Sequence, residues 1–236
     1  MQIFQLHTSV MHTNTYVVVN GGRAFVVDPG ADAEGIKKLL DENGAKLEAI
    51  LLTHAHFDHI GGVTELLRLT NPNGDDGDTV HTNGVAELLR LTQTDGENVG
   101  EHGVAVFLHK DETDKICSFK NLGFAMGVKV EPFVPDVLLK GGETVTIAGV
   151  KIKVIHTPGH AAGSVCYVAE DKIFSGDTIF LTSYGRTDFY DGSYAEIKNS
   201  IVNRLFRLKG DYTILPGHGE STTLDFERKN NMIICE

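Results

Sequence analysis

Cysteine is scarce in this 236-residue sequence, and no apolar run approaches the roughly 20 residues that span a bilayer. The three cysteines, Cys117, Cys166 and Cys235, are odd in number and far apart. They therefore predict neither a disulfide framework nor a CxxC site. The first residues lack the basic and apolar regions of a secretory signal. These absences predict a cytoplasmic protein that does not act on membranes.

Positive charge is also scarce, because 21 Lys and Arg face 32 Asp and Glu and the formal net charge is -11. The sequence has no run rich in Lys or Arg, which argues against nucleic acid or an anionic membrane as the main partner. A composition of 41% hydrophobic and 22% charged residues is typical of a globular chain with a sizeable core. We therefore expect a small-molecule substrate, and the oligomeric state is left open.

Short β-branched and aromatic runs, separated by Gly, Asn and Asp turns, predict strands in both halves of the chain. The expected strands cover 15–19, 24–27, 47–52, 104–108, 144–147, 150–155, 164–168, 172–174 and 212–215. Apolar positions at helical spacing predict helices over 32–43, 62–69 and 194–208. Strands dominate each half, so we expect an α+β fold of two packed sheets with helices outside.

One segment is duplicated within the chain. Residues 59–70, HIGGVTELLRLT, match residues 81–92, HTNGVAELLRLT, at nine of twelve positions. We interpret this as an insertion that added a second short helix and its loops, within a single domain over 1–236 that carries an inserted segment at about 71–103. We expect this segment to be peripheral, with a lid or an oligomer contact as the alternative. His81 copies His59 without the preceding HxHxD, so it is not predicted to be a metal ligand.

The run His54-Ala-His56-Phe-Asp58-His59 directly follows the apolar strand expected over 47–52. Side chains two apart in an extended segment point to the same side, so His54 and His56 can share one metal ion. Asp58 and His59 come where the chain turns toward the next helix, which suggests a second metal a few ångströms away. A mixture of imidazole and carboxylate ligands suits zinc, iron or manganese.

Three later turns offer the same kinds of ligand at strand ends. His160 lies in the run 156–160 (HTPGH), Asp177 in 175–178 (SGDT) and His218 in 216–219 (PGHG). A single His or Asp in a glycine-rich turn is more often a turn former than a ligand. Four polar turns at strand ends in one chain, each with a ligand-type residue, indicate one shared metal site.

Together, the motifs THAHFDH (53–59), TPGH (157–160), SGDT (175–178) and PGHG (216–219) closely resemble those of the metallo-β-lactamase-fold hydrolases. Within that superfamily they look most like small glyoxalase II-like, or hydroxyacylglutathione hydrolase-like, proteins. The runs VDPG (27–30) and GRTDF (185–189) add to this similarity. The resemblance implies an αββα sandwich of two mixed β-sheets with outer helices, with metals at one edge between the sheets.

The resemblance also implies two divalent metal ions, with zinc favoured and iron or manganese left open. Carried over by motif, the first metal would be held by His54, His56 and His160, the second by Asp58, His59 and His218, with Asp177 bridging. Two cations sharing a water lower its pKa from 15.7 toward about 7. Asp58 is expected to orient the resulting hydroxide.

The resemblance implies hydrolysis of a thioester such as an S-2-hydroxyacylglutathione, although the acyl group and the thiol carrier stay open. A thiolate leaves without a strong general acid, since thiol pKa values lie near 8.5. A persulfide dioxygenase with a single iron, or a lactonase, remains the alternative on the same scaffold. An exported metallo-β-lactamase lacks the bridging carboxylate and is disfavoured by Asp177. Arg186 and Asp188 are expected to form a buried pair that fixes their loop, with Arg186 or Tyr184 at the rim of the pocket as the alternative. His156 is expected to be structural.

Overall fold

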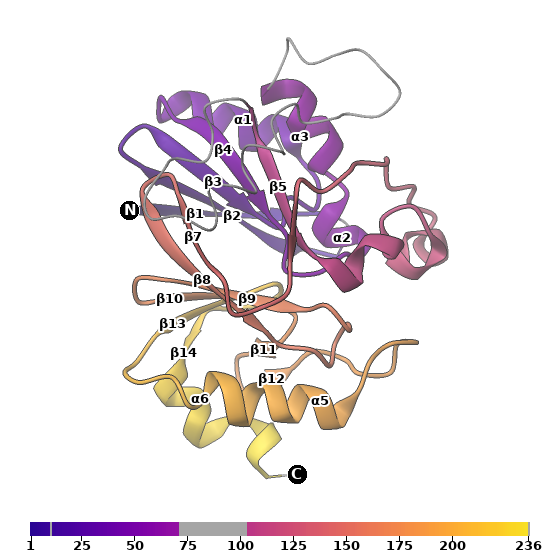
Figure 1. Cartoon of the computed structure of the whole chain (residues 1–236), viewed down its shortest axis with the longest axis vertical. Helices are drawn as coiled ribbons and strands as arrows, with labels where there is room; N and C mark the ends of the chain where they lie inside the picture. The colour runs from indigo at the N-terminus through magenta and orange to yellow at the C-terminus, as the bar shows by residue number, and fades with distance from the viewer. Residues whose placement is uncertain (10, 71–102, 236) are drawn as a thin grey trace.

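The protein, described here by a computed structural model over residues 1–9, 11–70 and 103–235, has two six-stranded sheets packed face to face. Helices cover the outer face of each sheet (Figure 1). The predicted αββα sandwich of two mixed β-sheets is therefore confirmed. The predicted insertion at about 71–103, with the copied helix over 81–92, lies almost wholly outside the described residues.

The first sheet has the order β1 (Gln2–Thr8), β2 (Thr13–Asn20), β3 (Arg23–Val27), β4 (Lys46–Leu51), β5 (Ala105–His109) and β6 (Val137–Leu139). β1 to β3 are antiparallel, and β3 to β6 are parallel. The β2–β3 hairpin turns at Gly21 and Gly22, whose φ values of 59° and 78° favour glycine. Because β3, β4 and β5 are parallel, the residues that follow them meet at one edge of the sheet.

The second sheet has the order β14 (Thr222–Thr223), β13 (Thr213–Pro216), β10 (Lys172–Gly176), β9 (Val165–Ala169), β8 (Val150–His156) and β7 (Thr144–Ile147). Only β10 and β13 pair in parallel. The turns after β8, β10 and β13 therefore leave this sheet on the same side. A separate hairpin pairs β11 (Ile179–Phe180) with β12 (Ser183–Tyr184).

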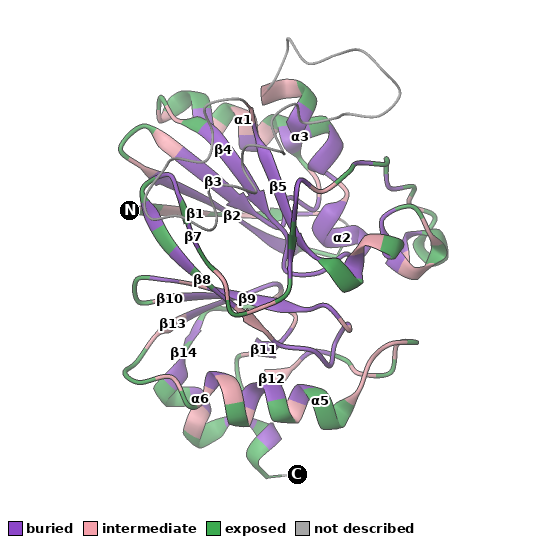
Figure 2. Ribbon diagram, viewed as in Figure 1, coloured by how far each residue is buried: buried purple, intermediate pink, exposed green. Residues whose placement is uncertain are grey.

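Burial divides the molecule into three apolar layers (Figure 2). Between the sheets, side chains such as Phe25 and Tyr167 pack at 0% exposure. Outside the first sheet lie α1 (Ala33–Glu42) and α3 (Val63–Thr70), and outside the second lie α5 (Tyr194–Asn199) and α6 (Leu224–Asn230). In the described part of the chain, no helix is both long and apolar enough to cross a membrane.

The helices begin and end where local chemistry allows. The Asp32 side chain accepts a hydrogen bond from the Gly35 N–H, which caps α1, and Gly44 at φ 56° follows its end. The helix predicted over 194–208 instead continues after α5 as a π-helical turn, Ser200–Leu205. Ile197 of α5 and the π-helical residues Ile201 and Leu205 are each four positions apart and buried. The wider turn therefore keeps all three side chains against the second sheet.

The connection between β5 and β6 was not predicted. It contains three 3₁₀ turns: η1 (Lys110–Lys115), η2 (Phe119–Asn121) and η3 (Gly123–Met126). Such short turns follow no hydrophobic period. Two of them begin at a side-chain cap: His109 Nδ1 accepts a hydrogen bond from the Asp111 N–H, and Ser118 Oγ accepts one from the Lys120 N–H. β1 was also missed.

Asp136 is a buried carboxyl just before β6, and it generates a prediction about stability. Its Oδ2 accepts a hydrogen bond from the Val106 N–H at 2.8 Å, but burial outweighs this bond and raises the pKa of Asp136 to about 7. An unfolded chain gives the same carboxyl a pKa near 3.9. The stabilising contribution of this group is therefore complete below about pH 4 and is lost as the pH rises through about 7.

Asp136→Asn keeps an oxygen acceptor for Val106 and removes the titration. We expect the natural chain to lose up to about 1.4 kcal/mol of unfolding free energy per pH unit relative to the variant over this window. Urea denaturation of both chains at pH 4, 5, 6 and 7 measures this difference. A difference that does not change with pH would contradict the raised pKa.

Candidate metal centre

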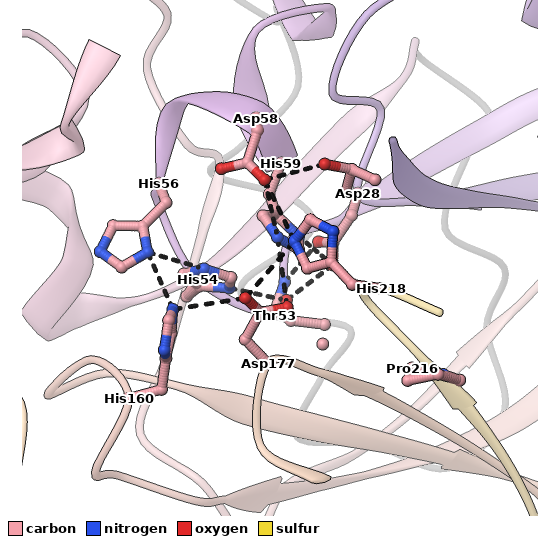
Figure 3. A network of polar contacts seen from close by, with 12 residues as sticks. Asp28, Thr53, His54, His56, Asp58, His59, His160, Asp177, Pro216 and His218 are labelled. Carbon is pink, nitrogen blue, oxygen red and sulfur yellow. Dashed lines mark hydrogen bonds and ion pairs between the residues drawn. The ribbon is translucent and has the colours of Figure 1, made fainter. Parts of the chain in front are cut away.

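The structure brings all seven predicted ligand side chains to one edge of the sandwich, between the sheets (Figure 3). They are His54, His56, Asp58, His59, His160, Asp177 and His218. Four of them follow β4, in the loop after Leu51 and in the short helix α2 (Phe57–Ile60). The other three occupy the turns after β8, β10 and β13. Strand ends of both sheets therefore supply the site.

The first cluster is a buried group of three imidazoles, His54, His56 and His160, exposed by 3% or less. His56 Nδ1 lies 3.1 Å from His54 Nε2 and 2.9 Å from His160 Nε2. We assign the proton of His160 to Nδ1, because this atom is 2.9 Å from the Arg186 carbonyl oxygen. Its Nε2 then presents a lone pair to His56. Three ring nitrogens that converge with too few protons to hydrogen-bond to one another favour a shared cation.

The second cluster, Asp58, His59 and His218, mixes carboxylate with imidazole. His59 Nδ1 donates to Asp28 Oδ2 at 2.9 Å, which turns its Nε2 toward Asp58 Oδ2 at 3.5 Å. His218 Nε2 lies 3.2 Å from the same Asp58 oxygen. Thr13 Oγ1 donates to that oxygen at 2.8 Å and fixes the carboxylate. This cluster thus contains a negatively charged side chain that the first cluster lacks.

Asp177 contacts both clusters. Its Oδ1 is 3.4 Å from His59 Nε2, and its Oδ2 is 3.5 Å from both His160 Nε2 and His218 Nε2. The side chain follows β10 at Gly176, where φ is 47° and an added Cβ would lie 2.2 Å from Thr53 Oγ1. Only glycine therefore lets the turn that carries Asp177 approach the loop after β4 so closely.

The electrostatics of the two clusters differ. Burial lowers the pKa of His54 and His56 well below the usual value, and neighbouring histidines lower it further, so both are neutral, the form that binds metal. Burial alone would raise the pKa of Asp58, but His59 and the hydrogen bond from His218 outweigh it and lower the pKa to about 2. Asp177 is likewise held ionised, chiefly by His59 against its own burial.

The donor atoms fit divalent metal ions. Among the described residues, the buried polar side-chain atoms without a hydrogen-bond partner include His59 Nε2 and Asp177 Oδ1, which lie 3.4 Å from each other. A buried unsatisfied polar atom costs about 1–3 kcal/mol, more when charged. Burial would lower the pKa of His59, but Asp58 and Asp177 raise it well above its usual value, so the two carboxylates attract positive charge of the kind that divalent cations would supply. His and Asp donors suit zinc, iron or manganese.

Asp28 supports the site from the end of β3, and its role was not predicted. Its carboxylate accepts from the Thr53 N–H at 2.8 Å, from Thr53 Oγ1 at 2.6 Å and from His59 Nδ1 at 2.9 Å. Asp28 therefore fixes the loop after β4 and also orients the ring of His59, one of the proposed ligands. The Val-Asp-Pro-Gly run after a strand was the available sequence signal for this role. Its glycine, Gly30, lets the main chain pass close to Asp58, because a Cβ added at Gly30 would lie 1.7 Å from the Asp58 carbonyl oxygen.

Asn14 on β2 holds the turn that carries His218. Its Nδ2 donates to the carbonyls of Pro216 at 3.0 Å and Gly219 at 2.9 Å, and its N–H donates to the Gly217 carbonyl at 2.7 Å. Tyr16 Oη also donates to the Pro216 carbonyl, at 2.7 Å. These bonds connect the two sheets across the site. No local pattern in the sequence could have shown them, because the partners are about 200 positions apart.

The predicted Arg186–Asp188 pair forms, with hydrogen bonds of 2.9 and 2.8 Å, but the prediction that it is buried is wrong. The two side chains are 70% and 65% exposed. The Arg186 guanidinium lies 4.8 Å above the ring of Phe189, which packs edge-on against His56 and His160. The pair therefore lies at the rim of the first cluster.

His156 and Cys166 do not carry the chemistry of the site. His156 Nε2 lies 2.9 Å from the Ala162 carbonyl and its ring stacks on His109, which agrees with the structural role expected for it. Cys166 is buried, and burial raises the pKa of its thiol to about 11, so it supplies no thiolate nucleophile near neutral pH.

The chain was compared with known proteins. A model of the Metallo-beta-lactamase superfamily matches residues 8–218. Hydroxyacylglutathione hydrolase GloC of Haemophilus influenzae is 28% identical over 88% of this chain and 85% of its own. Among solved structures, BLEG-1 B3 metallo-beta-lactamase has a TM-score of 0.81 with 29% identity over 100% of both chains. TTHA1623 in a di-iron-bound form has a TM-score of 0.74 with 28% identity, over 97% of this chain and 98% of that one.

The two clusters predict how many metal ions the chain binds. We expect the natural chain to bind two divalent ions and His218→Ala to keep about one, because the second cluster loses a ligand. His218 is 27% exposed, so its removal should leave the core intact. Equilibrium dialysis against Zn²⁺, followed by elemental analysis, measures the stoichiometry.

His7→Ala is the control, since His7 is an exposed histidine on β1 and should leave two ions bound. Two tightly bound ions in the His218→Ala chain would contradict the assignment of His218 as a ligand.

Proposed function

The chain belongs to the metallo-beta-lactamase superfamily, and from this premise we propose that it is a binuclear metal-dependent hydrolase of thioesters such as S-2-hydroxyacylglutathione. The observation that carries the proposal is Asp177, which lies within 3.5 Å of histidines from both clusters. A carboxylate in that place can bridge two cations. The di-iron-bound relative supports a two-metal site, and zinc or iron fits the same donors.

In the proposed site His54, His56 and His160 would hold one cation, and Asp58, His59 and His218 the other. When bound, two such cations supply the positive charge that polarises an acyl carbonyl and makes a shared water more acidic. Asp58 remains a carboxylate at neutral pH, since its pKa is lowered to about 2. It can therefore accept a hydrogen bond from the attacking water, while Thr13 fixes one of its oxygens.

A thioester fits this site because its leaving group needs little help. A thiol with a pKa near 8.5 departs as a thiolate without a strong general acid. Lys115, a buried cation, is committed to Glu112 and Asp191 at 2.7 and 2.6 Å and is not placed to protonate a leaving group. The name of the Haemophilus relative supports an S-acylglutathione as the first substrate to test.

The surroundings of the clusters indicate how a substrate would enter. Phe189 covers His56 and His160, with ring centroids 5.0 and 5.3 Å away. His218 is the most exposed of the seven proposed ligands, at 27%. We therefore infer that the acyl carbonyl approaches past His218 and that Phe189 shields the first cluster from water.

Hydrolysis of a β-lactam is the second candidate function. It is favoured by the likeness to a B3 metallo-beta-lactamase over the full length of both chains. The position of Asp177 between the two clusters, where it could bridge two cations, favours the thioesterase instead. The two functions need different scissile bonds, a thioester and a strained amide, so substrate assays separate them.

The test compares the same protein with and without metal. Chelator-treated protein should lose at least 99% of its hydrolysis of S-lactoylglutathione, and Zn²⁺ should restore it, because attack at neutral pH depends on the cations. The same holoprotein is then assayed with an acyl-coenzyme A, a lactone and a cephalosporin. We expect kcat/KM to be highest for the glutathione thioester.

Full activity in metal-free protein would contradict the proposal. Hydrolysis of the cephalosporin in preference to every thioester would support the second candidate. A single iron per chain with uptake of oxygen would identify a persulfide dioxygenase instead.

A further inference from the structure

Three charged side chains form a buried group beside the first cluster, here called the buried triad: Glu112, Lys115 and Asp191. Lys115 Nζ lies 2.7 Å from Glu112 Oε1 and 2.6 Å from Asp191 Oδ2. Glu112 is 0% exposed and Lys115 1%, and the Asp191 side chain is 14% exposed. Charged residues are almost never buried so completely without a specific partner. A buried ion group is weak evidence for stability alone, so its main-chain contacts indicate what it does.

The buried triad holds the two loops that carry the first cluster. Glu112 Oε2 accepts from the Ala55 N–H at 2.8 Å, and Glu112 Oε1 accepts from the Gly163 N–H at 2.8 Å. Ala55 lies between His54 and His56, and Gly163 lies three residues after His160. One carboxylate thus ties both ends of the three-histidine cluster together.

Asp191 adds a second tie to the His160 turn, because its Oδ2 accepts from the Ala162 N–H at 3.0 Å. Lys115 joins this tie to Glu112. Gly163 is needed for the approach, since an added Cβ would lie 2.6 Å from Glu112 Cγ. The distance between the His160 turn and the 3₁₀ turn η1 is therefore set by the close contact of Gly163 with Glu112 as well as by the charges of the buried triad.

The second cluster has separate support. Asp28 orients His59, Thr13 fixes Asp58, and Asn14 holds the His218 turn. The hydrogen bonds and ion pairs that the buried triad makes within the described residues go to Ala55, Ala162 and Gly163, beside the first cluster. The two clusters therefore have different supports.

We propose that Glu112, held in place by Lys115 and Asp191, is a positioning residue that sets the separation of the His54–His56 loop and the His160 turn, and so determines metal affinity at the first cluster alone. Its carboxylate is required because it has two oxygens that accept from two main-chain donors. A glutamine offers one oxygen and one NH₂ group, so it can hold only one of the two loops. This inference rests on the proposed metal binding but not on the proposed substrate.

The test measures the Zn²⁺ dissociation constant of each cluster by chelator competition. Glu112→Gln is made in two backgrounds, His218→Ala, which spares the first cluster, and His160→Ala, which spares the second. We expect Glu112→Gln to weaken binding by about 10–100-fold in the His218→Ala background, the usual loss when a group that orients metal ligands is removed. In the His160→Ala background we expect a change of less than about 3-fold.

Glu48→Gln is the matched control. Glu48 is also a buried carboxylate that accepts from a cation, Arg23, and from a main-chain N–H, that of Ala148 at 2.9 Å. It belongs to β4, and its side-chain hydrogen bonds within the described residues go to Arg23 and Ala148, away from both clusters. Its substitution should lower the unfolding temperature and leave both dissociation constants unchanged.

Asp191→Asn is the milder variant if Glu112→Gln does not fold, since an asparagine oxygen can still accept from Ala162. It should weaken the first cluster less than Glu112→Gln and spare the second. Unchanged affinity at the first cluster, or equal weakening of both clusters, would overturn the inference. If the natural chain bound no metal, the proposed function itself would fail. If the natural chain bound two ions and neither the Glu112 nor the Asp191 variant changed the metal affinity, the role of the buried triad alone would be rejected.

The absorption spectrum of the Co²⁺-loaded chain gives a second readout. A shift in the ligand-field bands of the His218→Ala chain on adding Glu112→Gln, but not Glu48→Gln, would show a changed coordination geometry. A merely structural role would lower the unfolding temperature and leave these bands in place.

Discussion

The contact of Asp177 with imidazoles from three separate turns is the constraint on which the rest of the structure depends. A buried carboxylate repels its neighbour Asp58 and needs positive charge nearby, and the surrounding histidines supply it, since they hold the pKa of both carboxyls below the usual value despite burial. Divalent cations shared between the clusters would take over this role. The close approach that this needs explains why Gly176 precedes Asp177 and why Gly30 faces the Asp58 main chain.

The sandwich makes such a site possible because strand ends of both sheets meet at one edge. β3 and β4 deliver Asp28 and the His54–His59 segment, while β10 and β13 deliver Asp177 and His218. Three of the four turns are held by hydrogen bonds between their main chain and a side chain from elsewhere, Asn14 for one turn and Glu112 for two. The ligand turns are thus fixed by the fold before any cation is considered.

The sequence predicted the αββα sandwich and the seven residues that meet at its edge, because strand-end turns and the HxHxDH run are local patterns. It could not predict Asn14 or Glu112, whose partners lie far along the chain. It also misjudged Arg186, since a pair two residues apart satisfies itself on the surface without burial. The 3₁₀ turns after β5 were missed because no period marks them. Ligand roles and the substrate remain predictions.

The most direct test of a two-metal thioesterase is to titrate metal-free protein with Zn²⁺ while following the hydrolysis of S-lactoylglutathione. Because attack at neutral pH is proposed to need both cations, the rate should stay low up to about one equivalent and rise steeply until about two equivalents are bound. A rate that reaches its maximum at one equivalent, or activity before any metal is added, would contradict the account.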